Sequence, residues 1–228
     1  GTDEHGQKIA EAAATAGQTP QAWADAVAAE DRALWERLDI THDRFIRTTD
    51  PDHVAVVQAV FSKLLERGDI VKGEYRGPYC VSDETFVAEA QLVDGKNCPD
   101  CGKPVTTVSE ATYLFRLSSY QERLLKHYEA HPEFIRPASR LAEVVNFVKG
   151  GLRDQSVSRL VSKVPWGVPV PGDPDHTVYV WFDALLNYLT AAGYPDEKKL
   201  SKTWPADVHV VGKEIVRFHA VIWPAMLM

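Results

Sequence analysis

Two short apolar runs near the end of the chain constrain its fold more than any other feature. Residues 178–182 (VYVWF) form a run of strand length that passes into a helical pattern at 183–190. Residues 208–211 (VHVV) are followed in the same way by Gly212 and a second helical pattern. Strands that are apolar on both faces and alternate with helices are typical of buried parallel sheets built from βα units. The last third is therefore predicted to be α/β, with ligands binding at the carboxyl ends of both strands.

Two helical segments are expected nearer the N-terminus. Residues 8–38 are rich in alanine with interspersed charges, and the Thr-Pro pair at 19–20 is a typical helix start. The Asp-Pro pair at 50–51 repeats that signal, and apolar residues then recur at helical spacing. Gly68 stands where such a helix would end.

The middle of the chain has a different sequence pattern. Between 69 and 117, short β-type runs alternate with glycine and proline, and all three cysteines of the chain lie here. This pattern predicts a small inserted domain with a weak core, of the kind that a metal ion stabilises. Residues 118–149 return to a helical pattern, whose apolar stripe ends at Gly150.

The cysteines have the spacing of a metal-binding knuckle. Two residues separate Cys80 from Asp83, and Cys98 and Cys101 repeat that spacing after 14 intervening residues. Thiolates and a carboxylate can together fill a tetrahedral zinc site, and four protein ligands leave no position for water. A zinc ion here would therefore be structural. The alternative is a knuckle that has lost its metal, with Asp83 as a turn residue.

Two further segments carry ionisable groups beside a glycine. Asp3 and His5 precede Gly6 and could bind an amine or a phosphate, although a solvated turn has the same pattern. Gly212 and Glu214 follow the second apolar run, where glycine lets a ligand approach and a carboxylate can accept hydrogen bonds from a ribose. A solvated charge pair is the alternative there.

Aromatic side chains gather in the two predicted βα units. Trp181, Tyr188, His219 and Trp223 could line a ligand pocket, but a plain aromatic core has the same pattern. The lysines of residues 199–203 (KLSKT) are typical of a solvated connection rather than of a triphosphate-binding loop.

Charge and cysteine content argue against two classes of protein, those that hold nucleic acid by bulk charge and those that are secreted. The 25 basic and 32 acidic side chains give a net charge of −7, which argues against holding nucleic acid by bulk electrostatics. Three cysteines at this spacing fit a reduced, cytoplasmic protein better than a secreted one. No signal-peptide pattern opens the chain, and no stretch approaches the roughly 18 apolar residues of a membrane span. Both ends look interrupted.

Six stretches of the sequence are more informative together than each is alone. They are 1–9 (GTDEHGQKI), 79–82 (YCVS), 154–159 (DQSVSR), 164–171 (VPWGVPVP), 179–188 (YVWFDALLNY) and 212–227 (GKEIVRFHAVIWPAML). In their order and approximate spacing they resemble the bacterial methionyl-tRNA synthetases, a family of class I aminoacyl-tRNA synthetases. The resemblance runs over essentially the whole chain, and VWFDAL and FHAVIWPAML are its most specific parts.

The resemblance implies a Rossmann-type catalytic domain with a parallel sheet, incomplete in these 228 residues. Residues 1–68 and 118–228 would be its two parts, and 69–117 the connective-peptide insertion with the zinc knuckle. Members of the family join L-methionine to ATP with Mg²⁺ and release pyrophosphate. They then move the methionyl group to the terminal ribose of tRNA(Met). The implied ligands are L-methionine, ATP with Mg²⁺, tRNA(Met) and a structural Zn²⁺.

The resemblance also assigns roles to single residues. Asp3 matches the carboxylate that holds the α-ammonium of the substrate, a charge-assisted contact. His5 and Arg159 match active-site residues, with Arg159 near the reacting carboxylate and phosphate. Gly212 and Glu214 match the pair that contacts the adenosine ribose, where many relatives carry Asp. The residues that match the pocket for the methionine side chain are Trp181, Ala184, Leu185, Tyr188, Ile215, His219 and Trp223. Aromatic rings suit a thioether.

Several family features have no counterpart in this sequence. The His-Ile-Gly-His and Lys-Met-Ser-Lys-Ser motifs, which hold ATP phosphates in the family, do not occur, and neither does the anticodon-binding helical bundle. Since electrostatic stabilisation is typically the largest catalytic contribution, the 228 residues alone are expected not to form methionyl-adenylate at a useful rate. At the knuckle, a Cys or His usually stands where Asp83 is.

Two other functions are compatible with these observations. One is a non-catalytic methionine- or metal-binding fragment. The other, more distant, is a class I synthetase for a branched amino acid, against which Tyr188 and His219 beside two tryptophans argue.

Overall fold

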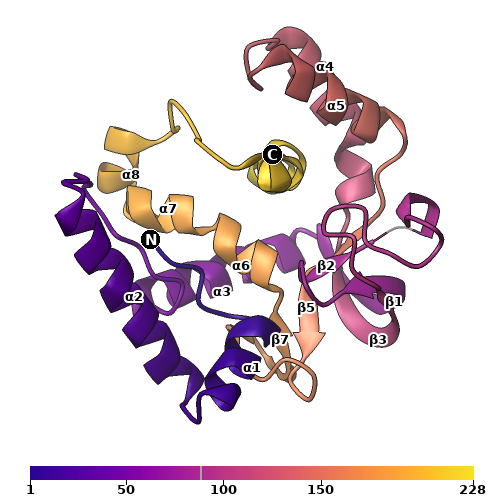
Figure 1. The fold of residues 1–228 in the computed structure, drawn as a ribbon. Helices are drawn as coiled ribbons and strands as arrows, with labels where there is room; N and C mark the ends of the chain where they lie inside the picture. Colours follow the sequence, from indigo (N-terminus) through magenta and orange to yellow (C-terminus); the bar gives the residue numbers. More distant parts are fainter. Residues whose placement is uncertain (88) are drawn as a thin grey trace.

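The N-terminal part of the chain is helical, as Figure 1 shows. The computed structural model describes residues 1–87 and 89–228. Helices α1 (Gln7–Thr15) and α2 (Pro20–Arg37) pack against each other. The hydroxyl oxygen of Thr19 accepts a hydrogen bond from the Ala22 N–H at 3.2 Å, so the predicted start of α2 is confirmed. The helical segment predicted over 8–38 is thus two helices.

Helix α3 (Pro51–Glu66) begins at the predicted proline. It ends two residues before Gly68, which has a φ of 76°, a conformation that glycine adopts without strain. One face of α3 is buried in the main core. The residues of that face are His53, Val56, Val57, Val60, Phe61 and Leu64.

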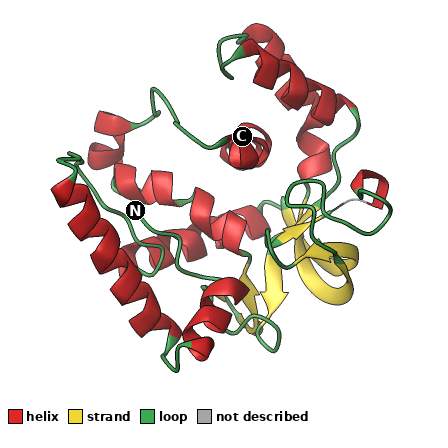
Figure 2. Cartoon of the chain, in the orientation of Figure 1, coloured by secondary structure: helices red, strands yellow, loops and turns green. Residues whose placement is uncertain are grey.

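A long hairpin follows α3. Strands β1 (Ile70–Cys80) and β3 (Thr106–Phe115) pair antiparallel from Ile70–Phe115 to Tyr79–Thr106. Strands β2 (Thr85–Phe86) and β4 (Gln155–Ser156) extend the sheet to the order β2-β1-β3-β4, and the turn η1 (Glu89–Gln91) lies beyond β2. A second sheet has the order β5-β7-β6, from β5 (Ser158–Leu160), β6 (Pro169–Val170) and β7 (Asp173–Val178). Figure 2 shows both sheets on one side of the molecule.

The predicted parallel sheet is absent from the described part of the chain. All named strand pairs are antiparallel, and the parallel pairing present is a single bridge between Thr2 and Arg47. Strand β7 ends at Val178, and helix α6 (Val180–Leu185) begins two residues later. The prediction of a strand over 178–182 was wrong after Val178, because a short apolar run fits a buried helix start equally well.

The second apolar run is also not a strand. Residues 208–211 are irregular, and Val208 and Val210 are 74% and 94% exposed. No strand within residues 1–87 and 89–228 pairs with this segment. A strand forms only where a neighbour accepts and donates its backbone hydrogen bonds, and composition does not supply that neighbour.

The remaining elements are helices that close the main core. The turn η2 (Leu117–Tyr120) leads into α4 (Gln121–Ala130), and α5 (Ala138–Lys149) ends before Gly150 as predicted. After α6 come α7 (Asn187–Ala192), α8 (Glu197–Thr203), η3 (Lys213–Ile215), the π-helical turn η4 (Phe218–Ile222) and α9 (Trp223–Leu227).

The core has one large part and one small part. The large part joins α3, the base of the hairpin, α4, α5, α6 and α9, and includes Phe61, Leu124 and Phe182. The small part contains Cys80, Val87 and Cys98, at the far end of the hairpin. None of the described helices is both long enough and apolar enough to cross a membrane.

Candidate functional site

Three parts of the chain meet around an open pocket of about 440 Å³. The N-terminal segment 3–9 forms one wall, and the turn 82–85 with residues 100–101 forms another. Residues 180–181 at the start of α6 and residues 214–218 complete the lining. The pocket thus brings together segments that are more than 200 residues apart in the sequence.

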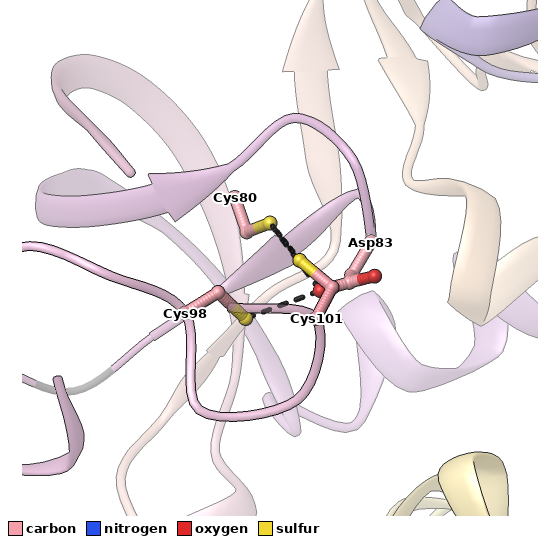
Figure 3. A group of neighbouring side chains, drawn as sticks. All are labelled: Cys80, Asp83, Cys98 and Cys101. Atoms are coloured by element: carbon pink, nitrogen blue, oxygen red, sulfur yellow. Dashed lines mark hydrogen bonds between the residues drawn. The ribbon is translucent and has the colours of Figure 1, made fainter. Parts of the chain in front are cut away.

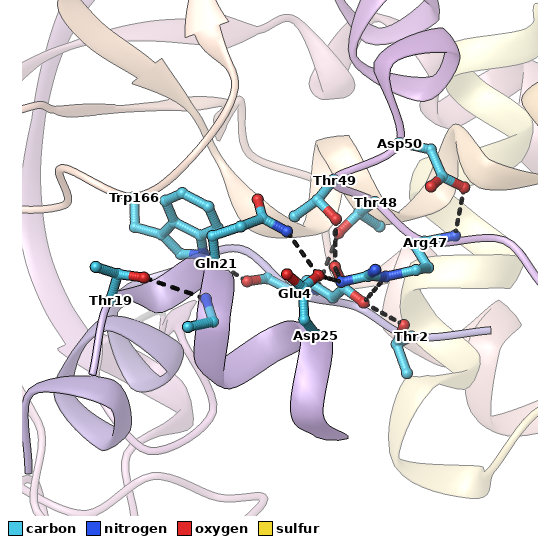
Figure 4. Close-up of polar contacts among 11 residues, drawn as sticks. Thr2, Glu4, Thr19, Gln21, Asp25, Arg47, Thr48, Thr49, Asp50 and Trp166 are labelled. Carbon is cyan, nitrogen blue, oxygen red and sulfur yellow. Dashed lines mark hydrogen bonds and ion pairs between the residues drawn. The ribbon is translucent and has the colours of Figure 1, made fainter. Parts of the chain in front are cut away.

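A buried polar cluster holds the segment that carries Asp3 (Figure 4). Glu4 is 2% exposed, and its carboxylate accepts hydrogen bonds from Arg47, at 2.7 Å for Nε and 3.0 Å for Nη2. The Glu4 backbone N–H donates to the Thr48 hydroxyl at 2.9 Å, and its carbonyl accepts from Trp166 Nε1 at 2.6 Å. Glu4 therefore anchors the segment, while Asp3 and His5 on either side of it line the pocket.

Asp3 is a carboxyl group in a strongly negative surrounding. Asp3 is exposed and lines the pocket. Desolvation by the surrounding protein raises the pKa of Asp3 well above its ordinary value, and the charges of Asp183, Glu84 and Glu4 add to the effect. A cationic group that entered the pocket would relieve this repulsion, so the site is suited to a positively charged ligand.

His5 belongs to a buried chain of hydrogen bonds behind the pocket. Its Nδ1 lies 2.7 Å from Asp183 Oδ2, and His53 Nε2 lies 2.8 Å from Asp183 Oδ1. His53 Nδ1 is in turn 3.0 Å from the Thr190 hydroxyl. Burial alone would raise the pKa of Asp183, but the hydrogen bonds from both histidines outweigh it, and the pKa is lowered. Asp183 is therefore a buried carboxylate that orients His5.

Sequence reasoning missed Asp183 and His53. Asp183 stands inside an apolar run and is fully buried, and a charge among apolar residues was a signal that could have singled it out. His53 lies on the apolar face of α3, where spacing alone predicts a core residue.

The aromatic residues form two groups. Trp181, which lines the pocket, stacks on Phe218 with ring centroids 3.8 Å apart and planes inclined by 12°. Tyr188, His219 and Trp223 form the second group, with the Tyr188 and Trp223 centroids 5.8 Å apart. They do not belong to the pocket lining in this structure.

The hydrogen bonds of His219 determine which ring nitrogen carries the proton. Burial lowers the pKa of His219, so the ring is neutral near pH 7. Nδ1 lies 2.9 Å from the Ile215 carbonyl, which can only accept, so Nδ1 carries the proton. Nε2 then accepts from the Tyr188 hydroxyl at 2.7 Å. Tyr188 and His219 together therefore form an uncharged, polarisable surface.

The predicted metal ligands lie together at the end of β1 (Figure 3). The ligand atoms of Cys80, Asp83, Cys98 and Cys101 are all within 4.8 Å of one another. Asp83 Oδ2 is 3.3 Å from Cys80 Sγ and 3.1 Å from Cys98 Sγ, and the sulfurs of Cys80 and Cys101 are 3.5 Å apart. Tetrahedral zinc would place neighbouring ligand atoms roughly 3.5–3.8 Å apart, slightly further than the 3.1–3.5 Å found here, so small shifts of the three sulfurs and the carboxylate would admit the ion.

The residues assigned to ATP lie in two places, Gly212 with Glu214 at the pocket and Arg159 away from it. Glu214 is exposed and lines the pocket, and Gly212 precedes it by two residues. Arg159 is 5% exposed, donates from Nε to Glu110 at 2.6 Å and lies 4.3 Å above the ring of Tyr79. It is not part of the pocket lining.

Comparison with known proteins identifies the family. A family model described as tRNA synthetases class I (M) matches residues 1–228. The chain belongs to this family. Its observed structure is the mixed α/β fold of a class I synthetase catalytic domain.

Individual members of this family are similar to the chain in sequence. A methionine–tRNA ligase of Caldanaerobacter subterraneus is 57% identical over all of this chain and 36% of its own length. One from Streptomyces coelicolor is 54% identical over all of this chain and 44% of its own. The chain therefore spans less than half the length of these relatives.

A solved structure of a class I (M) relative is also similar. The Mycobacterium tuberculosis methionyl-tRNA synthetase bound by methionyl-adenylate is 50% identical, with a TM-score of 0.93 over all of this chain and 46% of that one. The free form of the M. tuberculosis protein has a TM-score of 0.80 over 90% of this chain.

The structure brings together only some of the site residues that the sequence predicted. The predicted residues that line the pocket are Asp3, His5, Trp181, Glu214 and Ile215, together with Asp83 and Cys101 of the cysteine cluster. Leu185 is buried at 1% exposure, and Ala184 is partly buried beside it on α6. Through Asp83 and Cys101, the cysteine cluster adjoins the pocket directly.

Proposed function

We propose that the complete gene product is a methionine–tRNA ligase, which activates L-methionine with ATP and transfers it to tRNA(Met). The observation that carries this proposal is a pocket with Asp3 on one wall and Trp181 on another. It occurs in a chain 50% identical to a synthetase bound by methionyl-adenylate. Family membership does not favour the alternative of a non-catalytic methionine- or metal-binding fragment.

Recognition of methionine would use charge at one end and shape at the other. The Asp3 carboxylate would bind the α-ammonium group, and His5, oriented by Asp183, would border the same end. Aromatic rings favour contact with a thioether sulfur. The residues proposed for the side-chain end are Trp181, Ala184, Leu185, Tyr188, Ile215, His219 and Trp223.

Activation would follow from placing ATP beside the amino acid. A carboxylate oxygen of methionine attacks the α-phosphorus, and the bond to the leaving pyrophosphate breaks. Gly212 and Glu214 are proposed to contact the adenosine ribose. The resemblance implies a position for Arg159 near the reacting groups. Because Glu110 and Tyr79 hold it outside the pocket lining, we propose that Arg159 acts by supporting the pocket wall.

Two ions belong to this proposal. Mg²⁺ would accompany ATP as part of the substrate. Cys80, Asp83, Cys98 and Cys101 would hold a structural Zn²⁺, which would stabilise the small core at the far end of the hairpin. We propose 69–117 as the inserted domain and 1–68 with 118–228 as the catalytic domain, acting in the cytoplasm.

Binding of an analogue without the amino group tests the role of Asp3. In calorimetry on the complete gene product, methionine should bind about 10- to 100-fold more tightly than 4-(methylthio)butanoate, because a charge-assisted contact is lost in the analogue. Asp3→Asn should erase that preference. As pH falls through the raised pKa of Asp3, its carboxyl becomes neutral, so the affinity of the wild type for methionine should fall.

The matched control is Asp100→Asn, which changes another acidic residue of the pocket lining and should keep the preference. Equal binding of methionine and the analogue by the wild type would contradict the proposed role, as would an unchanged preference in Asp3→Asn.

A further inference from the structure

The turn between β1 and β2 is part of the pocket lining and also contacts two other walls at once, the segment 3–9 and the start of α6. It carries Asp83 and Glu84, and Glu84 is held at a φ of 47°, an uncommon conformation for a residue with a side chain. Asp83 Oδ2 lies 3.3 Å from Cys80 Sγ and 3.1 Å from Cys98 Sγ, and these contacts, or a zinc ion shared by the same atoms, fix the turn to the hairpin.

The side chain of Glu84 contacts the first wall. Its Oε1 accepts hydrogen bonds from the backbone N–H groups of Gln7 at 2.6 Å and Lys8 at 3.2 Å, at the start of α1. A carboxylate is favoured there because these N–H groups have no partner within the helix. Gly6 lies against the same carboxylate, since a Cβ at this position would stand 2.6 Å from Glu84 Oε1.

The backbone of the turn contacts the second wall. The Tyr179 hydroxyl donates to the Glu84 carbonyl, and Trp181 Nε1 donates to the Asp83 carbonyl at 3.4 Å. Tyr179 and Trp181 flank the first residue of α6. The turn therefore links the segment that carries Asp3 and His5 to the segment that carries Trp181.

We infer that Glu84 is a positioning residue, which sets the separation between the Asp3 wall and the Trp181 wall for the amino acid. This inference rests on the proposed function. Its basis is that one residue, through its side chain and its carbonyl, is hydrogen-bonded to both walls. Glu84 acts on the substrate through Asp3 and Trp181, and a displacement of about 1 Å in such groups can cost a factor of about 100.

Steady-state kinetics of methionine-dependent ATP–pyrophosphate exchange test the inference on the complete gene product. Glu84→Ala should raise the KM for methionine roughly tenfold or more, with the KM for ATP unchanged. Glu84→Gln should raise it less, because an amide oxygen still accepts both hydrogen bonds without the charge. A role in folding alone would lower the active fraction, and with it kcat, but would not change the KM for methionine.

Two further variants keep the test decisive. Glu89→Ala replaces an exposed glutamate five residues further on and should leave both KM values unchanged. Tyr179→Phe removes only the hydroxyl that donates to Glu84, so it should fold even if Glu84→Ala does not, and it should raise the KM for methionine.

The results separate this inference from the proposed function. A wild type without methionine-dependent exchange would refute the proposed function. A wild type with that exchange, whose KM for methionine stays within about twofold in Tyr179→Phe and in every soluble Glu84 variant, would overturn the positioning role alone.

Discussion

Asp183 is the residue on which the geometry behind the pocket depends. It is fully buried, and its two carboxylate oxygens contact His5 and His53. A buried carboxylate is stable only while its partners remain, since its desolvation must be offset by hydrogen bonds. His5 therefore faces the pocket in an orientation that α3 and α6 determine together.

Replacing Asp183 should destabilise the protein. Asp183→Asn loses the charge that both histidines contact and should lower the free energy of unfolding by about 3 kcal/mol in urea titrations. The matched control is Asp52→Asn, whose side chain is 58% exposed in its ion pair with Arg44 and should cost less than about 1 kcal/mol.

The contribution of Asp183 to stability depends on pH. The folded-state pKa of Asp183 is lowered, so its contribution to stability is present above the unfolded pKa, about 4, and is lost as pH falls through the folded pKa. The stability difference between wild type and Asp183→Asn should therefore shrink in acid. A difference below 1 kcal/mol at neutral pH would contradict the role of Asp183.

Among single residues, the sequence predicted those that belong to a recognisable motif. Asp3, Trp181 and Ile215 were assigned by resemblance and do line the pocket. His53 and Asp183 could not be paired in advance, because 130 residues separate them and only tertiary packing brings them together.

The end of the hairpin is the element that depends most on the cluster of Cys80, Asp83, Cys98 and Cys101. Its small core contains Cys80, Val87 and Cys98, which is little apolar surface for a folded unit. Removing zinc with a chelator should therefore increase amide hydrogen exchange over residues 80–105, while α3 stays protected by the large core.

Cys98→Ser should reproduce the effect of the chelator and lower the zinc content, measured by plasma mass spectrometry, from one ion per chain. Ser82→Ala lies in the same turn outside the cluster and should keep its zinc. Purified protein without zinc, whose exchange does not respond to the chelator, would show that the knuckle is held without a metal.

Elements set by local signals were predictable, and those set by distant neighbours were not. The Thr19 cap of α2 and the prolines at the starts of α2 and α3 act within one turn of helix, and both helices begin where expected. The runs at 178–182 and 208–211 look alike in composition. The first contains a buried helix start and the second is exposed, because partners elsewhere in the chain decide their state.

At the scale of the whole molecule, the chain contains a pocket assembled from segments at both ends of its sequence and from the hairpin between them. It spans 36% and 44% of the length of two methionine–tRNA ligases with which it shares more than half of its residues. The 228 residues include neither His-Ile-Gly-His nor Lys-Met-Ser-Lys-Ser. Activity is therefore expected of the complete gene product, and the 228-residue polypeptide by itself should be inactive.

Amino-acid-dependent ATP–pyrophosphate exchange tests the central claim most directly. The complete gene product should exchange pyrophosphate with methionine well above the rate with leucine, isoleucine or valine, and the 228-residue polypeptide should show no exchange above background. An apolar pocket discriminates by shape, with about 10- to 200-fold for one methylene, so weak activity with the other amino acids is compatible. Exchange that is fastest with a branched amino acid, or is independent of methionine, would contradict the claim.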